Sequence, residues 1–126
     1  MRAGLSAAIV IVVAAFGLSA CGSRSVETDN PNATVNAGAK LFAERCAGCH
    51  QLDKAGTEGG ALKVGDREKT DGPNFNVRKE KKEEVLYAIR NGGFSGAIMP
   101  ENIVVGKDAE AVAAFLAEYS GKGKGN

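Results

Sequence analysis

The chain has 126 residues, of which 16 are basic and 15 acidic, and its formal net charge is +1. This length fits a single domain with some flanking sequence, and the balanced charge excludes an overall field that would attract nucleic acid. The three cysteines and the one histidine are unevenly distributed, since two cysteines and the histidine lie within residues 46–50.

The N-terminal segment has the organisation of a secretory signal. Residues 3–21 contain no charged side chain, follow Arg2 and end in small residues. A basic start, an apolar centre and a small-residue end are typical of a signal peptide. The segment is also long enough to be an uncleaved membrane helix. Both interpretations place the rest of the chain outside the cytoplasm.

The end of this segment indicates a lipid attachment site. The sequence "LSAC" at residues 18–21 resembles the bacterial lipobox, in which cleavage precedes the cysteine and its sulfur receives a diacylglycerol. We therefore predict a lipoprotein-type signal peptide over residues 1–20, lipid attachment at Cys21, and an extracytoplasmic protein that two or more acyl chains anchor to the membrane. Ordinary cleavage near Ala20, which would leave a free thiol, is the alternative.

The composition predicts flexible segments on both sides of one domain. Residues 21–35 are polar and rich in Asn and Ser, and such a segment buries too little apolar surface to fold, so a flexible tether is expected. Residues 121–126, "GKGKGN", are expected to be a disordered tail. The folded domain is predicted to span residues 36–120, which is small for an unaided hydrophobic core.

Three segments of this domain have helical periodicity, and no convincing alternating strand appears. They are "NAGAKLFAERCAG", "KKEEVLYAIRNGG" and "KDAEAVAAFLAEYSG", at residues 36–48, 81–93 and 107–121. Thr34 or Asn36 is expected to cap the first helix and Asp108 the third. Gly92 and Gly121 are expected to end the second and third. The sequence therefore predicts an all-α domain.

The long segment between the first two helices needs a separate explanation. Residues 51–79 are polar and glycine-rich, and a loop of this length is uncommon in so small a domain unless something organises it. We therefore expect a group that is not protein to fill the centre of the fold.

The sequence "CAGCH" at residues 46–50 identifies that group. Cys-X-X-Cys-His is the attachment pattern of c-type haem: both thiols can form thioethers to one porphyrin, and His50 then reaches the iron. A structural disulfide would leave His50 unexplained. A thioredoxin-like redox pair would require a βαβ unit, which is not visible. A zinc site would require four ligands, which this chain does not offer.

The second axial ligand is predicted to be Met99. His50 is the single histidine and Met1 is the initiator, so Met99 is the one thioether of the mature chain. It precedes Pro100 in a glycine-flanked loop suited to presenting a side chain, and filling a gap in the core is its alternative role. A His/Met pair keeps iron six-coordinate and raises its reduction potential.

The domain resembles a monohaem class I cytochrome c over roughly Asn36–Ser120. The likeness lies in "CAGCH", in "GPNF" at residues 72–75 and in "MP" at residues 99–100. It implies three main helices and long loops wrapped around one covalently bound haem c. It also implies one-electron transfer and no enzymatic activity. Together with the N-terminal signal, this places the expected function at the outer face of the bacterial cytoplasmic membrane or in the periplasm.

The same resemblance implies roles for further residues. The carbonyl of Pro73 would accept a hydrogen bond from the free ring nitrogen of His50, and Gly38 with Phe42 would cross the last helix near Phe115. Gln51 stands where many relatives have Gly or Thr, and Phe115 stands where Tyr is frequent, which bears on the subfamily. Residues expected in the haem pocket, or alternatively in a generic core, are Leu62, Tyr87, Ile89, Phe94 and Ile98.

Three classes of function stay open at this point. The first is an electron carrier tethered by its lipid to the membrane, with redox proteins as partners: a respiratory or photosynthetic chain, or a membrane dehydrogenase or oxidase complex. The second is a haem enzyme or gas sensor, which requires a vacant sixth position on the iron. The third is a structural or thiol–disulfide protein without haem.

Overall fold

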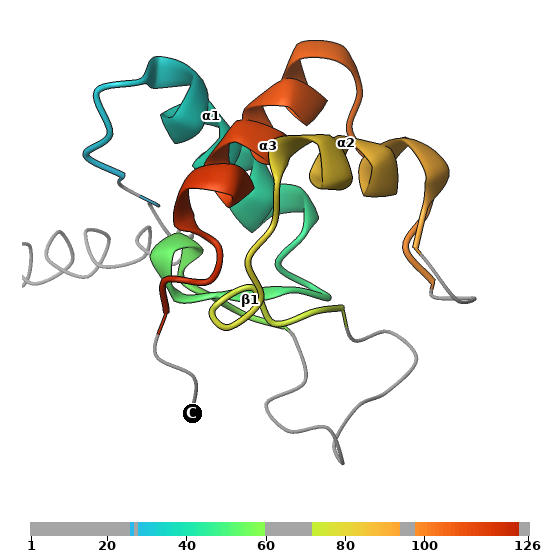
Figure 1. Ribbon diagram of the computed structural model, residues 1–126, viewed down its shortest axis with the longest axis horizontal. Helices are drawn as coiled ribbons and strands as arrows, with labels where there is room; N and C mark the ends of the chain where they lie inside the picture. The colour runs from blue at the N-terminus through green and yellow to red at the C-terminus, as the bar shows by residue number, and fades with distance from the viewer. Residues whose placement is uncertain (1–25, 27, 60–71, 94–97, 124–126) are drawn as a thin grey trace, which may run out of the picture.

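The chain folds into three α-helices that pack against one another. The computed structural model describes Val26 and residues 28–59, 72–93 and 98–123. The helices are α1 (Ala33–Arg45), α2 (Lys82–Asn91) and α3 (Gly106–Tyr119). Figure 1 shows α1 crossing α3, with α2 alongside α3. Within the described part of the chain, no helix is both long enough and apolar enough to cross a bilayer.

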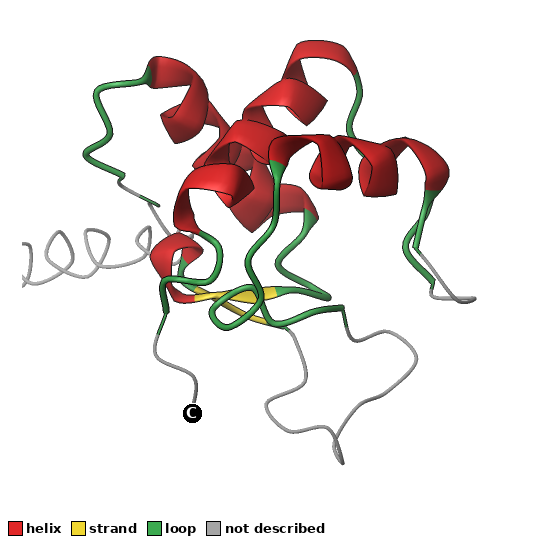
Figure 2. Ribbon diagram, in the orientation of Figure 1, coloured by secondary structure: helices red, strands yellow, loops and turns green. Residues whose placement is uncertain are grey.

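A short hairpin that the sequence did not predict lies below the helices in Figure 2, with its 3-10 helix in contact with α1. It consists of the antiparallel strands β1 (Gln51–Leu52) and β2 (Thr57–Glu58), joined through the 3-10 helix η2 (Asp53–Ala55). Strands of two residues are too short for alternating hydrophobicity to be recognised. The fold is otherwise the predicted all-α arrangement of three helices and long loops.

Helix α1 forms because its apolar residues recur at helical spacing. Its buried residues are Val35, Gly38, Ala39 and Phe42, which follow the i, i+3, i+4, i+7 pattern of one helix face. The Asn32 side chain accepts a hydrogen bond from the Thr34 N–H at 2.9 Å. The N-cap is therefore Asn32, and the predicted caps at Thr34 or Asn36 are wrong because both residues already lie within the first turns.

The crossing of α1 and α3 is close because Gly38 has no side chain. A Cβ atom on Gly38 would lie 2.0 Å from the carbonyl oxygen of Ala111. One turn further along α1, the rings of Phe42 and Phe115 have centroids 5.8 Å apart, and both side chains are fully buried. This is the helix contact that the family resemblance implied.

Helix α3 begins two residues earlier than its predicted cap. Val105 is the N-cap, with extended backbone angles and no side-chain hydrogen bond, and Asp108 donates its N–H to the Val105 carbonyl. The prediction that Asp108 caps this helix is therefore wrong. Its carboxylate instead lies in the first turn, where negative charge interacts favourably with the helix N-terminus.

The packed domain starts before residue 36. Thr28 is buried, the Asn36 amide donates to the Asn30 carbonyl at 2.7 Å, and the Asn30 amide donates to the Tyr119 hydroxyl at 3.0 Å. Residues 28–32, here called the strap, thus lie against α1 and α3. Side-chain amides of Asn make these contacts, so a composition poor in apolar residues did not predict them.

The other predicted flexible positions are only partly described. Gly121 and Gly123 donate their N–H groups to the carbonyls of Phe75 and Asn76, so the start of the predicted disordered tail packs against the domain. The predicted signal peptide, the lipid attachment position Cys21 and the last three residues of the tail lie outside the described residues.

Candidate functional site

One cavity brings together all the site residues predicted within the domain. Its volume is about 630 Å³, within the range of about 300–1,000 Å³ that ligand sites occupy. Its walls come from the turn after α1, the loop before α2, α2 itself, the segment around Met99, and α3. The predicted site residues that line it are Cys46, Cys49, His50, Pro73 and Met99.

The turn after α1 places both thiols and the imidazole at this cavity. The N–H groups of Cys49 and His50 donate to the Cys46 carbonyl at 3.1 and 2.9 Å, which closes a tight turn. Cys46 and Cys49 are not joined by a disulfide. Burial, together with the nearby Cys49, raises the pKa of Cys46 to about 12. A low-pKa thiolate, which a thioredoxin-like redox pair requires, is therefore not formed at Cys46.

His50 is held as a neutral imidazole. Its Nδ1 lies 3.2 Å from the Pro73 carbonyl oxygen, and because a carbonyl can only accept, Nδ1 carries the proton and Nε2 keeps its lone pair. Burial lowers the pKa of His50, against the opposing effect of the Pro73 hydrogen bond, and Arg78 lowers it further. A neutral ring with a free Nε2 is the form that binds a metal.

The His50 ring is clamped by two residues whose roles the sequence did not reveal. Phe75 stacks on it with ring centroids 4.7 Å apart and an interplanar angle of 14°. A Cβ on Gly72 would lie 2.3 Å from the ring, so only glycine fits there. The sequence did show an aromatic residue two positions after Pro73. Its role could be recognised only once the structure placed it beside the His50 ring.

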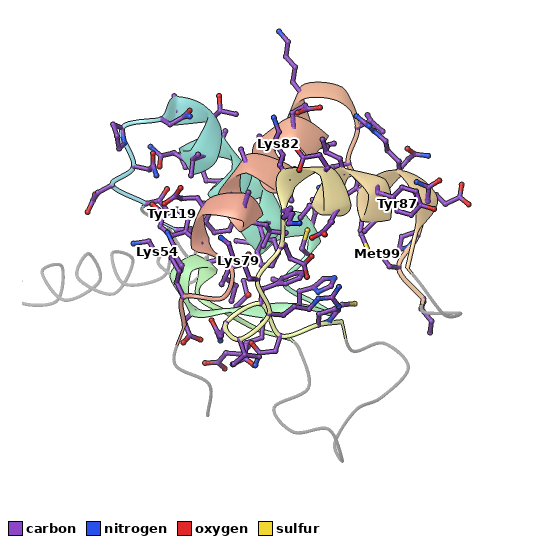
Figure 3. The ribbon with its side chains drawn as sticks, viewed as in Figure 1. Lys54, Lys79, Lys82, Tyr87, Met99 and Tyr119 are labelled. Carbon is purple, nitrogen blue, oxygen red and sulfur yellow. The ribbon has the colours of Figure 1, made fainter. Side chains whose placement is uncertain are left out.

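Met99 reaches the cavity because the chain turns sharply after α2. Gly92 has φ of 77°, and a Cβ on it would lie 2.9 Å from the Met99 carbonyl oxygen. Gly93 donates its N–H to that same oxygen at 3.2 Å. The Met99 side chain is partly buried against the core, and it lies at the end of α2 away from Tyr119 and Lys54 (Figure 3).

The remaining predicted pocket residues divide into two groups. Ile89, Tyr87 and Ile98 line the cavity; Ile89 is buried, whereas Tyr87 and Ile98 are more than half exposed. Leu62 and Phe94 lie outside the described residues.

The wall formed by the loop before α2 is charged. Arg78, Lys79 and Glu80 line the cavity there, and Arg45, the last residue of α1, also lines it. Glu80 is buried, and its Oε1 lies 2.5 Å from the Arg78 Nε. Burial raises the pKa of Glu80, and the Arg78 charge only partly opposes this effect. An ionised Glu80 is therefore a cost to the folded state.

Replacing this carboxylate should stabilise the protein in a pH-dependent way. Because the folded-state pKa of Glu80 is raised, its contribution is most favourable below the ordinary glutamate pKa of about 4.3 and is lost as pH rises through the folded pKa. We expect Glu80→Gln to unfold at higher denaturant concentration than wild type at pH 7. The difference should shrink toward pH 4. A variant less stable than wild type at pH 7 would contradict the assignment.

The comparisons with known proteins agree with this geometry. The family model for cytochrome c matches residues 35–120. The chain belongs to the cytochrome c family. It is similar to the c-type cytochrome SorU from Sinorhizobium meliloti, with 32% sequence identity and a TM-score of 0.52. That match covers 72% of this chain and 95% of SorU. No curated protein sequence matches the chain.

Members of this family carry covalently attached haem c and transfer electrons through it. Cys46 and Cys49 fit its attachment pattern. The cavity fits this group on its own chemistry, because thiols, a neutral imidazole and a thioether share a mostly apolar wall. Arg45, Arg78 and Lys79 add positive charge that complements the acidic groups of a porphyrin. Cytochrome c domains of this kind are typically extracytoplasmic.

Proposed function

We propose that this cytochrome c is an electron carrier and not an enzyme, with His50 and Met99 as its axial ligands. The observation that carries the proposal is that both side chains line the same cavity as Cys46 and Cys49. The neutral, clamped state of His50 supports the first ligand. The fixed backbone at Met99 supports the second.

Haem c supplies the one-electron couple, and residues of the chain would orient it and set its reduction potential. His50 offers Nε2 while Pro73 holds Nδ1, which fixes the tautomer and makes the imidazole a stronger donor. Met99 offers a neutral sulfur, which favours the ferrous state and raises the potential. Cys49 is exposed, so we place the path of electron exchange with redox proteins along this side of the cavity.

The competing function is a haem enzyme or gas sensor, which needs an open coordination position. Met99 is tied to Gly93 through its backbone and packed against the core through its side chain. Displacing it would cost these contacts. This arrangement favours a closed site and a carrier.

The proposal is tested on protein purified after expression with a cytochrome maturation system. We expect a mass increase of one haem on the mature chain, reversible one-electron cycling, and no change in the ferrous visible spectrum on adding carbon monoxide. A colourless product would contradict the haem assignment. A spectrum altered by carbon monoxide would instead favour the enzyme or sensor.

We also propose that the protein is a lipoprotein held by Cys21 at the outer face of the cytoplasmic membrane or on the periplasmic side. The proposal rests on the "LSAC" sequence after an uncharged segment. We expect wild type to fractionate with membranes and Cys21→Ser to become soluble with an unchanged haem spectrum. Mass spectrometry should find diacylglycerol on Cys21. A Cys21→Ser variant that stays in the membrane fraction would indicate an uncleaved helix.

A further inference from the structure

A pair of side-chain amides links the two segments that carry His50 and Pro73. The Asn74 Nδ2 donates to the Gln51 Oε1 at 2.8 Å. These residues directly follow His50 and Pro73, whose own hydrogen bond is 3.2 Å long. We call Gln51 and Asn74 the amide clasp.

The backbone also joins these two segments at the same level. Gln51 and Asn74 form a parallel bridge, in which the Phe75 N–H donates to the Gln51 carbonyl at 2.9 Å. On the other side of His50, the Gly72 N–H donates to the Cys49 carbonyl at 2.6 Å. The hydrogen bond from His50 to Pro73 therefore lies between two fixed points, and the amide clasp reinforces one of them.

The direction of the amide clasp is set by its surroundings. The Asn74 Oδ1 accepts from the Asn76 N–H at 2.9 Å, a side-chain turn typical of Asn. The oxygen must face that N–H, so the NH₂ group faces Gln51. Gln51 is only 6% exposed, and a buried amide that loses its partner is costly. Both observations favour a pair that stays formed.

We propose that the amide clasp is a positioning pair that holds the Pro73 carbonyl on His50 Nδ1 and thereby sets the donor strength of this ligand. The inference rests on the proposed function, since it takes His50 as the axial ligand. It also gives a role to Gln51, the residue that directly follows the proposed ligand His50. The Gln51 side chain accepts the hydrogen bond of Asn74, the residue that faces it across the bridge.

The expected electrochemical effect follows from the hydrogen bond to Nδ1. A firm bond makes the imidazole more basic, which stabilises ferric iron. Without the amide clasp the carbonyl is held less firmly, the imidazole becomes a weaker donor, and the balance moves toward ferrous iron. We expect the preference of the site for ferric over ferrous iron to fall about three- to tenfold. This fall corresponds to a midpoint potential that is higher by ~30–60 mV.

Two variants of the holoprotein break the amide clasp with little other change. Gln51→Met keeps the volume and removes the acceptor. Asn74→Ser keeps an oxygen for the turn with Asn76 but is too short to reach Gln51. We expect each to raise the potential and to speed solvent exchange of the His50 Nδ1 proton in NMR spectra. The double variant should match the singles, because both remove the same contact.

The matched control is Asn76→Ala. Asn76 links the same two segments through Asp53, accepting from its N–H and donating to its carboxylate, both at 2.8 Å. It lies further along from His50 and is also buried. We expect this variant to lose stability while the potential and the Nδ1 proton exchange stay unchanged. If Asn76→Ala shifted the potential and the Nδ1 proton exchange as much as the two clasp variants do, the amide clasp would only stabilise the loop and would have no specific effect on His50.

The outcomes separate this inference from the proposed function. Wild-type protein lacking the near-infrared band of a thioether-ligated ferric haem would contradict the proposed ligation. With that band present, an unchanged potential and unchanged Nδ1 exchange in Gln51→Met and Asn74→Ser would overturn the amide clasp alone. If one of the two variants fails to fold, the other gives the same decision.

Discussion

Met99→Ala should abolish the near-infrared band of the ferric protein and lower its midpoint potential. Removal of the thioether leaves the iron with water or no ligand at the sixth position, and the ferrous state loses the neutral sulfur that favours it. Axial ligands span about 0.8 V of potential, so we expect a fall on the order of 0.2 V. Absorption spectroscopy and protein-film voltammetry measure the two effects.

The control for this variant is Ile98→Ala. Ile98 is the preceding residue and also lines the cavity, but it is 59% exposed and has no atom that can bind iron. It should keep the band and shift the potential only slightly. An unchanged visible and near-infrared spectrum in Met99→Ala would mean that Met99 is a packing residue, and the vacant-site functions would then regain support.

Gly38→Ala should strongly destabilise the protein. The new Cβ would lie 2.0 Å from the Ala111 carbonyl oxygen and 2.9 Å from the Phe115 Cβ. Neither the backbone of α3 nor the packed core can move aside without a large cost in free energy. Separation of α1 from α3 would disturb the contact of Phe42 with Phe115. We expect a loss of at least ~3 kcal/mol in the free energy of unfolding of the holoprotein, measured with guanidinium.

Gly48→Ala is the matched control for the added methyl group. Among the described residues, no heavy atom lies within 4 Å of a Cβ at Gly48. The same substitution there should change stability by no more than about 0.5 kcal/mol. Equal unfolding midpoints for Gly38→Ala and wild type would mean that the two helices can part without cost, contrary to the close crossing.

The helices and the family could be predicted from the sequence because each rests on a local pattern. In α1, Phe42 belongs to the predicted apolar spacing and is buried, although the helix begins at Ala33, before the predicted start at residue 36. The attachment motif is a covalent requirement confined to residues 46–50. Met99 could be chosen as the candidate second ligand by elimination, since Met1 is the other methionine of the sequence, and the structure places it at the cavity.

Contacts between distant segments were not predictable in the same way. Gln51 and Asn74 are separated by a long loop, and only the folded backbone pairs them. The stacking of Phe75 on His50 has the same origin. The cap at Asn32 was missed for a different reason: several Asn and Thr residues compete near the start of α1, and backbone angles decide among them.

The strap limits how far this cytochrome c can extend from a bilayer. Asn30 is fastened to Tyr119, at the end of the domain away from Met99 (Figure 3). With a lipid on Cys21, about five residues of chain would separate the acylated sulfur from Val26, which is buried in the core, and these reach ~18 Å at full extension. A free segment up to residue 35 would have reached ~50 Å. If Cys21 carries the proposed lipid, any redox partner would thus have to reach this domain close to the surface of the bilayer.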